Sequence, residues 1–240
     1  LTESIFNDLN QGNLVDLEPM NEFIDRTISS LDRNDQALFA LLHMQRKAGE
    51  LYEHAFSVFS LALSISMAMG LSESSQKKIG LAALLHDAGW LKLPMQLFGK
   101  GKTYSEAEQK LVDQHANLTV KLMKTATDIN SEMIYLIQSH HESYSSDENT
   151  QLSDDLKMLG GILAVADKYD ELVHQLLDQP GVVPKSALKQ LYVDAQKGHL
   201  NSQAVQCLIG LMGVYPISSA VLLNTGEKAI VMECFRDKPS

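Results

Sequence analysis

The spacing of apolar side chains predicts helices over most of this chain. In residues 1–33, an amphipathic spacing after Pro19 predicts one short helix. Its apolar positions are Met20, Phe23, Ile24 and Ile28. Residues 34–69 keep a helical pattern almost throughout, with a break at Gly49 between two helices and a stop at Gly70.

A helix over about residues 74–85 leads into His86 and Asp87, and Gly89 and Pro94 break the pattern just after them. A capping box of Ser105 and Glu108 predicts the start of another helix. Further helices are predicted on both sides of His115, from about residue 129, and over about 156–177, 185–197 and 202–212.

Near the end of the chain the spacing of apolar residues changes from a helical to a strand-like pattern. Residues 220–223 and 229–232 are apolar and flank the turn sequence 224–227, which predicts a β-hairpin. The predicted fold class is therefore all-α with a small C-terminal β-hairpin. We divide the chain into 1–33, an arm or the end of a preceding domain, 34–213, a helical domain, and 214–240, the hairpin appendage.

Composition and charge narrow the classes of function. A chain of 240 residues that is 45% hydrophobic can bury a sizeable core in one domain plus an appendage. The net charge of −10, without a lysine- or arginine-rich block, argues against a nucleic-acid polymer as partner. Cys207 and Cys234 provide no disulfide framework, which fits a reducing cytoplasm. We predict no membrane-spanning segment, and because the chain begins at Leu1 we expect it to be a piece of a longer protein.

The chemistry is indicated by an ordered series of histidines and carboxylates. His86 and Asp87 stand side by side at a helix end, a pair that suits bridging two ions or binding one ion beside a water. The other members of the series are Glu50, His54, His115, His140, His141 and Asp167. If these groups were only caps and core residues, several ionisable groups would be buried without partners, which is costly. Imidazoles and carboxylates suit iron, manganese or zinc, and a two-metal pair favours phosphodiester hydrolysis.

Over about residues 49–233 the sequence resembles the HD-GYP family, HD-superfamily phosphodiesterases that in bacteria hydrolyse cyclic di-GMP at a two- or three-metal site. The resemblance rests on His86-Asp87-x-Gly89-x(4)-Pro94, on His140-His141-Glu142, on the run 161–170 and on the tail 215–227. It implies an HD-superfamily helical bundle with two or three divalent ions, most simply Fe, with Mn or Zn as alternatives. The metal ligands it implies are Glu50, His54, His86, Asp87, His115, His140, His141 and Asp167.

For the remaining site residues we expect catalytic roles for Asp87 and Asp170. Substrate contacts are expected at Trp90, Lys92, Lys100 and Tyr144. The ligand implied is cyclic di-GMP or a related small nucleotide, and a protein partner and a homodimer through the N-terminal helices are further expectations.

Three departures from the family pattern keep other functions open. Trp90 stands where the family has a lysine, residues 143–155 lack the Gly-Tyr-Pro motif, and the arginine-containing segment after Asp170 is replaced by 173–179. One alternative is thus a metal-containing nucleotide sensor or scaffold with weakened catalysis. Another is a nucleotide phosphohydrolase of the wider HD superfamily. A buried Trp90 would indicate core packing, and an exposed one would indicate ligand stacking.

Overall fold

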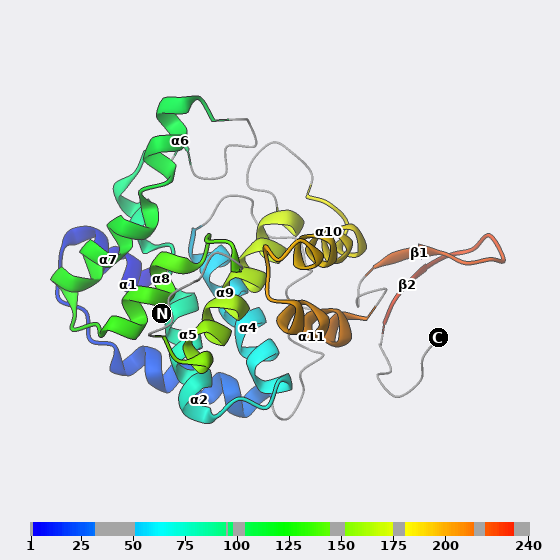
Figure 1. Ribbon diagram of the computed structural model, residues 1–240, viewed down its shortest axis with the longest axis horizontal. Coiled ribbons are helices and arrows are strands. Elements are labelled where there is room, and N and C mark those ends of the chain that lie inside the picture. Colours follow the sequence, from blue (N-terminus) through cyan, green and yellow to red (C-terminus); the bar gives the residue numbers. More distant parts are fainter. Residues whose placement is uncertain are drawn as a thin grey trace.

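The chain folds as a bundle of helices with one small sheet (Figure 1). The computed structural model describes residues 2–31, 51–94, 96–97, 104–144, 152–174, 181–213 and 219–232. The helices are α1 (Thr2–Gln11), α2 (Glu18–Leu31), α4 (Leu51–Ala68), α5 (Glu73–Leu85), the 3-10 helix η1 (Ala88–Lys92), α6 (Glu106–Val112), α7 (His115–Ala126), α8 (Ser131–Ser139), α9 (Asp154–Val173), α10 (Pro184–Gln196) and α11 (Ser202–Met212). The predicted fold class, all-α with a C-terminal β-hairpin, is confirmed.

The centre of the bundle is α4, which packs against α5, α9 and α11. Most of its residues are apolar or small, so it can be covered on nearly every side. By length and composition α4 is also apolar enough to cross a membrane. However, 72% of that stretch is buried inside the protein, which is the behaviour of a core helix.

Short polar side chains fix where the helices begin. Ser105 accepts the backbone N–H of Glu108, whose carboxylate accepts the N–H of Ser105, so the predicted capping box is confirmed. The long helix α9 begins two residues earlier than predicted, because Ser153 caps it by accepting the N–H of Leu156.

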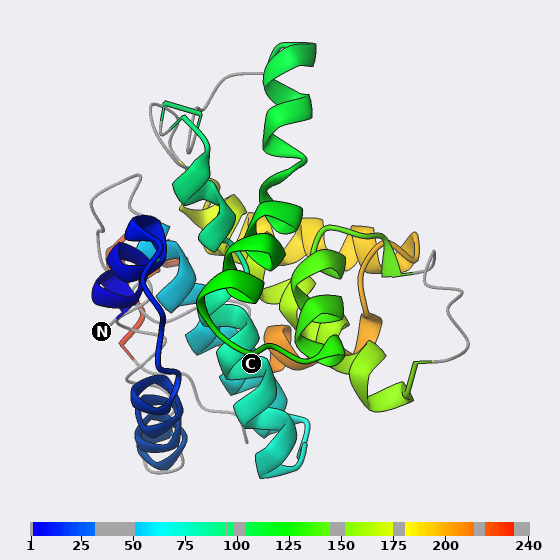
Figure 2. The ribbon, with the colours of Figure 1, turned by 90° about the vertical axis from the view of Figure 1, so that its left-hand side faces the viewer.

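The N-terminal segment contains two helices, whereas its pattern predicted one. The helix that the sequence analysis missed is α1, whose Ile5, Phe6 and Leu9 are buried. α1 contacts α4, η1 and α7, and α2 contacts α5, so both pack on the same flank of the bundle (Figure 2). α1 has only ten residues, so its own apolar pattern is short. The helix is stabilised by packing on helices distant in sequence, which the local pattern does not show.

The C-terminal strands β1 (Ala220–Leu222) and β2 (Lys228–Ile230) pair antiparallel and confirm the hairpin. Gly226 has a φ of 87° in the turn, a conformation that favours glycine. The hairpin extends away from the helices (Figure 1). The domain boundaries at 33 and 213 stay predictions.

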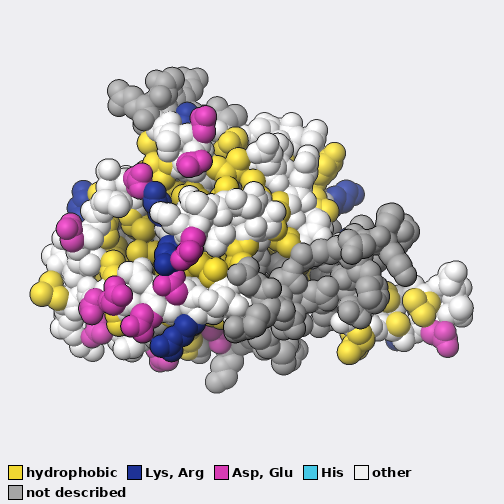
Figure 3. Space-filling model, turned by 90° about the horizontal axis from the view of Figure 1, so that it is seen from below, with side chains coloured by type: hydrophobic (Ala, Val, Ile, Leu, Met, Phe, Trp, Pro, Cys, Tyr) yellow, Lys and Arg dark blue, Asp and Glu magenta, His cyan; other side chains and the backbone are white. Residues whose placement is uncertain are grey.

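On the face seen in Figure 3, acidic and basic side chains are interspersed among apolar ones, and the described residues form no continuous basic patch there.

Candidate metal centre

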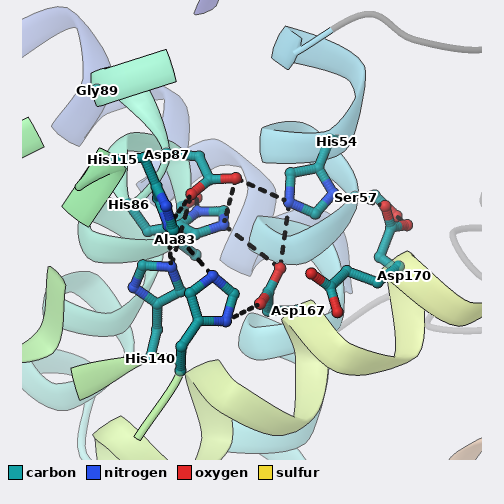
Figure 4. A network of polar contacts seen from close by, with 12 residues as sticks. His54, Ser57, Ala83, His86, Asp87, Gly89, His115, His140, Asp167 and Asp170 are labelled. Carbon is teal, nitrogen blue, oxygen red and sulfur yellow. Dashed lines mark hydrogen bonds and ion pairs between the residues drawn. The ribbon is translucent and has the colours of Figure 1, made fainter. Parts of the chain in front are cut away.

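Histidines and carboxylates from α4, α5, α7, α8 and α9 meet at one point in the bundle (Figure 4). His54 lies on α4 and Asp167 on α9, two helices that pack side by side. The remaining histidines lie at helix ends: His86 is the C-cap of α5, His115 is the first residue of α7, His140 is the C-cap of α8, and His141 directly follows His140. A helix end gives a side chain freedom to turn inward, so three helices of different direction can converge here.

Three of the histidines are held through hydrogen bonds of their Nδ1 atoms. The acceptors are backbone carbonyls three residues earlier: Ala83 O for His86 at 2.8 Å, Val112 O for His115 at 2.6 Å and Ile137 O for His140 at 2.6 Å. These carbonyls belong to the last turns of helices, which lack intrahelical donors. A carbonyl can only accept, so each Nδ1 carries a proton, and a neutral ring then presents the Nε2 lone pair to the centre.

The inward-facing atoms form two groups of donors. The first group consists of His54 Nε2, His86 Nε2, Asp87 Oδ2 and Asp167 Oδ1, with His–Asp separations of 3.2–3.6 Å. The second group consists of Asp87 Oδ1 and the Nε2 atoms of His115, His140 and His141, with separations of 3.1–3.5 Å where the atoms are neighbours. Asp87 therefore belongs to both groups, one oxygen to each.

Both groups fit divalent ions. Donors about 2.1 Å from a tetrahedral ion lie about 3.4 Å from one another, which matches the spacings in each group. His86 Nε2, in the first group, and Asp87 Oδ1, in the second, are buried and have no hydrogen-bond partner. Buried polar atoms are normally satisfied, and among the described residues neither atom is, so each group has one atom that points to a ligand within it. In the second group His115 Nε2 also lies 3.2 Å from His140 Nε2, and two lone pairs at that distance repel unless a cation or proton lies near them.

The charges of the first group are strongly coupled. Burial disfavours the charged form of His54, but hydrogen bonds to Asp167, Asp170 and Asp87 outweigh it and raise its pKa well above the usual value. Burial likewise opposes ionisation of Asp87, yet His86 and His115 with their neighbours hold its pKa well below the usual range. The centre thus stabilises carboxylate anions that are available to a cation.

Asp170, expected to be catalytic, lies behind His54 instead of facing the centre. Its Oδ2 is 2.9 Å from His54 Nδ1, on the far side of the ring from Nε2. It also accepts a hydrogen bond from Ser57 and lies 2.9 Å from His174 Nδ1, and it is 2% exposed. From this placement we expect Asp170 to orient His54, and its catalytic role stays a prediction.

We expect Asp170→Asn to weaken metal binding at the first group. An asparagine offers no negative acceptor for His54 Nδ1, so the ring loses its fixed orientation, and affinity should fall about 10–100-fold. Competition against a coloured chelator measures this. The matched control is Asp155→Asn, an exposed carboxylate in the first turn of the same helix. Equal affinity in the two variants would contradict the role of Asp170.

The residues expected to contact substrate are dispersed. Trp90 is 7% exposed and stacks on His115 at 5.5 Å between ring centroids, so its environment indicates core packing. Lys92 is exposed and its ammonium donates to the carbonyl of Asn10 on α1 at 2.9 Å. Tyr144 is 38% exposed and lies against Gly161. Glu50 and Lys100 lie outside the described residues, so their expected roles stay predictions.

Two residues that the sequence analysis missed lie beside the centre. Thr119 accepts the N–H of Gly89 at 2.7 Å and lies 3.0 Å from the His86 carbonyl, tying η1 to α7. Glu171 has a donor atom within 4.8 Å of those of His141 and Asp167, and burial and the Asp167 charge raise its pKa. The spacing of four residues between Asp167 and Glu171 was a signal that could have identified Glu171.

Comparisons with known proteins show the family of the chain. Residues 35–203 match a family described as HD domain. The chain is 22% identical over 232 residues to the cyclic di-GMP phosphodiesterase PA4108 of Pseudomonas aeruginosa, covering 96% of this chain and 56% of that protein. It is 26% identical over 187 residues to the cyclic di-GMP phosphodiesterase response regulator RpfG of Xanthomonas campestris, covering 77% and 47%. The chain therefore spans about half the length of the curated relatives it matches.

Two solved structures share the fold. Bd1817, a HDG"Y"P protein from Bdellovibrio bacteriovorus, aligns with a TM-score of 0.68 at 22% identity, over 86% of this chain and 66% of that one. The HD domain of the Listeria monocytogenes phosphodiesterase PgpH, solved with cyclic-di-AMP, aligns with a TM-score of 0.51 at 13% identity, over 73% and 92%. At these identities the two structures show a shared fold and nothing more.

Proposed function

Because the chain belongs to the HD domain family, as a member of the HD-GYP type, we propose that it is a metal-dependent phosphodiesterase that hydrolyses cyclic di-GMP or a related cyclic dinucleotide. The observation that carries the proposal is the pair of donor groups joined by Asp87, whose two oxygens lie 3.3–3.6 Å from histidines of both groups. A cytoplasmic setting is part of the same proposal.

The donor set defines what the protein itself contributes. His54, His86, Asp87 and Asp167 would hold one ion, and Asp87 with His115, His140 and His141 would hold another. Divalent ions bound there supply Lewis-acid polarisation of a phosphodiester and lower the pKa of water enough to give a nucleophile near neutral pH. We expect Fe, Mn or Zn because the donors are imidazoles and carboxylates.

The surrounding residues hold these donors in position. The Nδ1 contacts of His86, His115 and His140 to backbone carbonyls fix which nitrogen faces the centre. Six of the seven donor residues are at most 7% exposed at their side chains, so water reaches them only in a restricted way. The exception is His141, whose side chain is 45% exposed. Substrate would therefore approach on the side of His141.

The substrate class is supported by the relatives. Two curated relatives are named cyclic di-GMP phosphodiesterases, and the PgpH domain was solved with cyclic-di-AMP. The proposal therefore includes both cyclic dinucleotides as candidates and places cyclic di-GMP first. The identity of the metal and the number of ions are also part of the proposal.

The test is a hydrolysis assay on protein of measured metal content. Protein loaded with Fe(II) or Mn(II) should convert cyclic di-GMP to the linear dinucleotide or GMP, and chelator treatment should abolish this, as followed by chromatography. Cyclic-di-AMP, ppGpp and dNTPs are run beside it, because turnover of ppGpp or dNTPs alone would replace the proposal with a phosphohydrolase. Loaded protein that converts none of them would contradict the proposed hydrolysis of nucleotides.

That last outcome would favour a metal-containing nucleotide sensor. The observation in favour of this second function is Trp90, which stands at the position of the family's lysine and is buried against His115, so no cation comes from that position. Binding of cyclic di-GMP to the loaded protein without product, measured by calorimetry, is the result that this function predicts.

A further inference from the structure

Every described donor of the centre except one is deeply buried. His54, His86, Asp87, His115, His140 and Asp167 have side chains that are 0–7% exposed. His141 is 45% exposed, and beside it Glu171 is 36% exposed. Within the described chain, an ion coming from solvent therefore first meets the side of the centre formed by these two residues.

Two inner residues also present a second donor atom toward this side. Asp167 points Oδ1 at His54 and His86, while its Oδ2 lies 3.6 Å from His141 Nδ1. His141 points Nε2 at His115 Nε2, 3.1 Å away, while its Nδ1 faces Asp167. A separation of 3.6 Å is too long for a hydrogen bond, but it is close to the distance of about 3.4 Å between two ligands of one tetrahedral ion.

Glu171 completes this outer group. It lies one helical turn after Asp167 on α9, so both side chains share a face of the helix. A carboxylate oxygen of Glu171, a nitrogen of His141 and an oxygen of Asp167 all lie within 4.8 Å of one another. The group combines two carboxylates with one imidazole, a donor set that suits Mn(II), Fe(II) and Zn(II).

We infer that Glu171, Asp167 Oδ2 and His141 Nδ1 form an outer cation position through which divalent ions enter the buried centre. A neutral imidazole has one lone pair, so His141 serves the outer position through Nδ1 or the second donor group through Nε2, and not both at once. An ion held by Glu171 and Asp167 would pass inward as His141, whose side chain is 45% exposed, loses its proton from Nε2 to water and takes one up at Nδ1, which turns its lone pair to the second donor group. The inference rests on the proposed function only in requiring that the inner groups bind ions.

Lys168 allows the role of Glu171 as a metal ligand to be tested separately from its ion pair with Lys168. The Lys168 ammonium lies 2.9 Å from Glu171 Oε2, and the Lys168 side chain is 46% exposed. Glu171→Gln removes both the ion pair and the negative ligand. Lys168→Met removes the ion pair and leaves the ligand, so it is the matched control.

The experiment measures how fast metal-free protein takes up Co(II), by stopped-flow absorbance, and how many ions it holds at equilibrium. If uptake scales with occupancy of the outer position, Glu171→Gln should slow it about tenfold or more, as loss of one ligand-shell contact weakens metal affinity about 10–100-fold. The final number of ions should be unchanged. Lys168→Met should take up Co(II) at least as fast as the wild type, since a competing cation is gone.

The outcomes separate this inference from the proposed function. Uptake by Glu171→Gln at the wild-type rate would overturn the entry position while leaving the inner centre intact. Fewer ions in Glu171→Gln at equilibrium would also overturn it, because Glu171 would then belong to the permanent centre. A wild-type protein that binds no Co(II), Mn(II) or Fe(II) would instead defeat the proposed function.

Discussion

Replacing Asp87 with asparagine should leave the protein folded but without a working metal centre. Asp87 is the residue that both donor groups share: Oδ2 lies 3.4 Å from His54 Nε2 and 3.6 Å from His86 Nε2, and Oδ1 lies 3.3 Å from His115 Nε2 and 3.5 Å from His140 Nε2. An asparagine has the same shape, but it is neutral and presents an NH₂ group to one of the two groups. Each group thus loses its contact with the Asp87 carboxylate.

The expected effect is large because one substitution acts on both groups. We expect affinity for the divalent ions to fall by at least about 100-fold, and hydrolysis of cyclic di-GMP by at least about 10³-fold, the upper end for loss of one charge-stabilising contact. Metal content by elemental analysis and hydrolysis by chromatography give the two readouts. Circular dichroism shows whether the helices are kept.

The matched control is Asp113→Asn. Asp113 is an exposed carboxylate at the C-cap of α6, where it accepts a hydrogen bond from Gln109 at 2.7 Å. This variant should hold the same number of ions as the wild type. If Asp87→Asn also retained its full metal content, the shared carboxylate would not be a ligand and the two-group description of the centre would be wrong.

Replacing Gly89 with alanine should destabilise the centre through the backbone. A Cβ at position 89 would lie 1.9 Å from the carbonyl oxygen of His115 and 2.6 Å from the backbone nitrogen of Thr119. Both atoms belong to the first turns of α7, which cannot move without displacing His115. The close approach also permits the hydrogen bond from Gly89 N–H to Thr119 Oγ1, which would be lost as η1 and α7 separate.

We expect Gly89→Ala to lower the free energy of unfolding by about 3 kcal/mol, the upper part of the range for overpacking a filled site. Urea denaturation of metal-free protein measures this without a contribution from ion binding. The second donor group should also lose affinity for its ion, because His115 is displaced from Asp87.

Gly210→Ala is the control with the opposite expectation. Gly210 lies on α11, and an added Cβ would have no neighbour within 4 Å. Alanine favours a helix over glycine by about 1 kcal/mol, so this variant should be as stable as the wild type or more stable. If Gly89→Ala behaved like Gly210→Ala, the close packing of η1 on α7 would not be required for the fold.

The amino-acid sequence alone determined much of this protein. Its apolar periodicity located the helices of the bundle other than α1, and its change of period located the hairpin, because both signals are local. It also supplied the ordered histidines and carboxylates, and His54, His86, Asp87, His115, His140, His141 and Asp167 do lie together. Short polar side chains before an apolar run predicted a helix start correctly at Ser105.

The tertiary structure decided how those residues are used. Apolar periodicity predicts which face of one helix a side chain occupies. The packing of α4, α5 and α9 determines which residues contact that face. Only the packed bundle shows that Asp170 contacts Nδ1 of His54, and that Trp90 stacks on His115. The division of the donors into two groups that share Asp87 likewise depends on atoms from distant segments lying within 4 Å, a distance that no local pattern encodes.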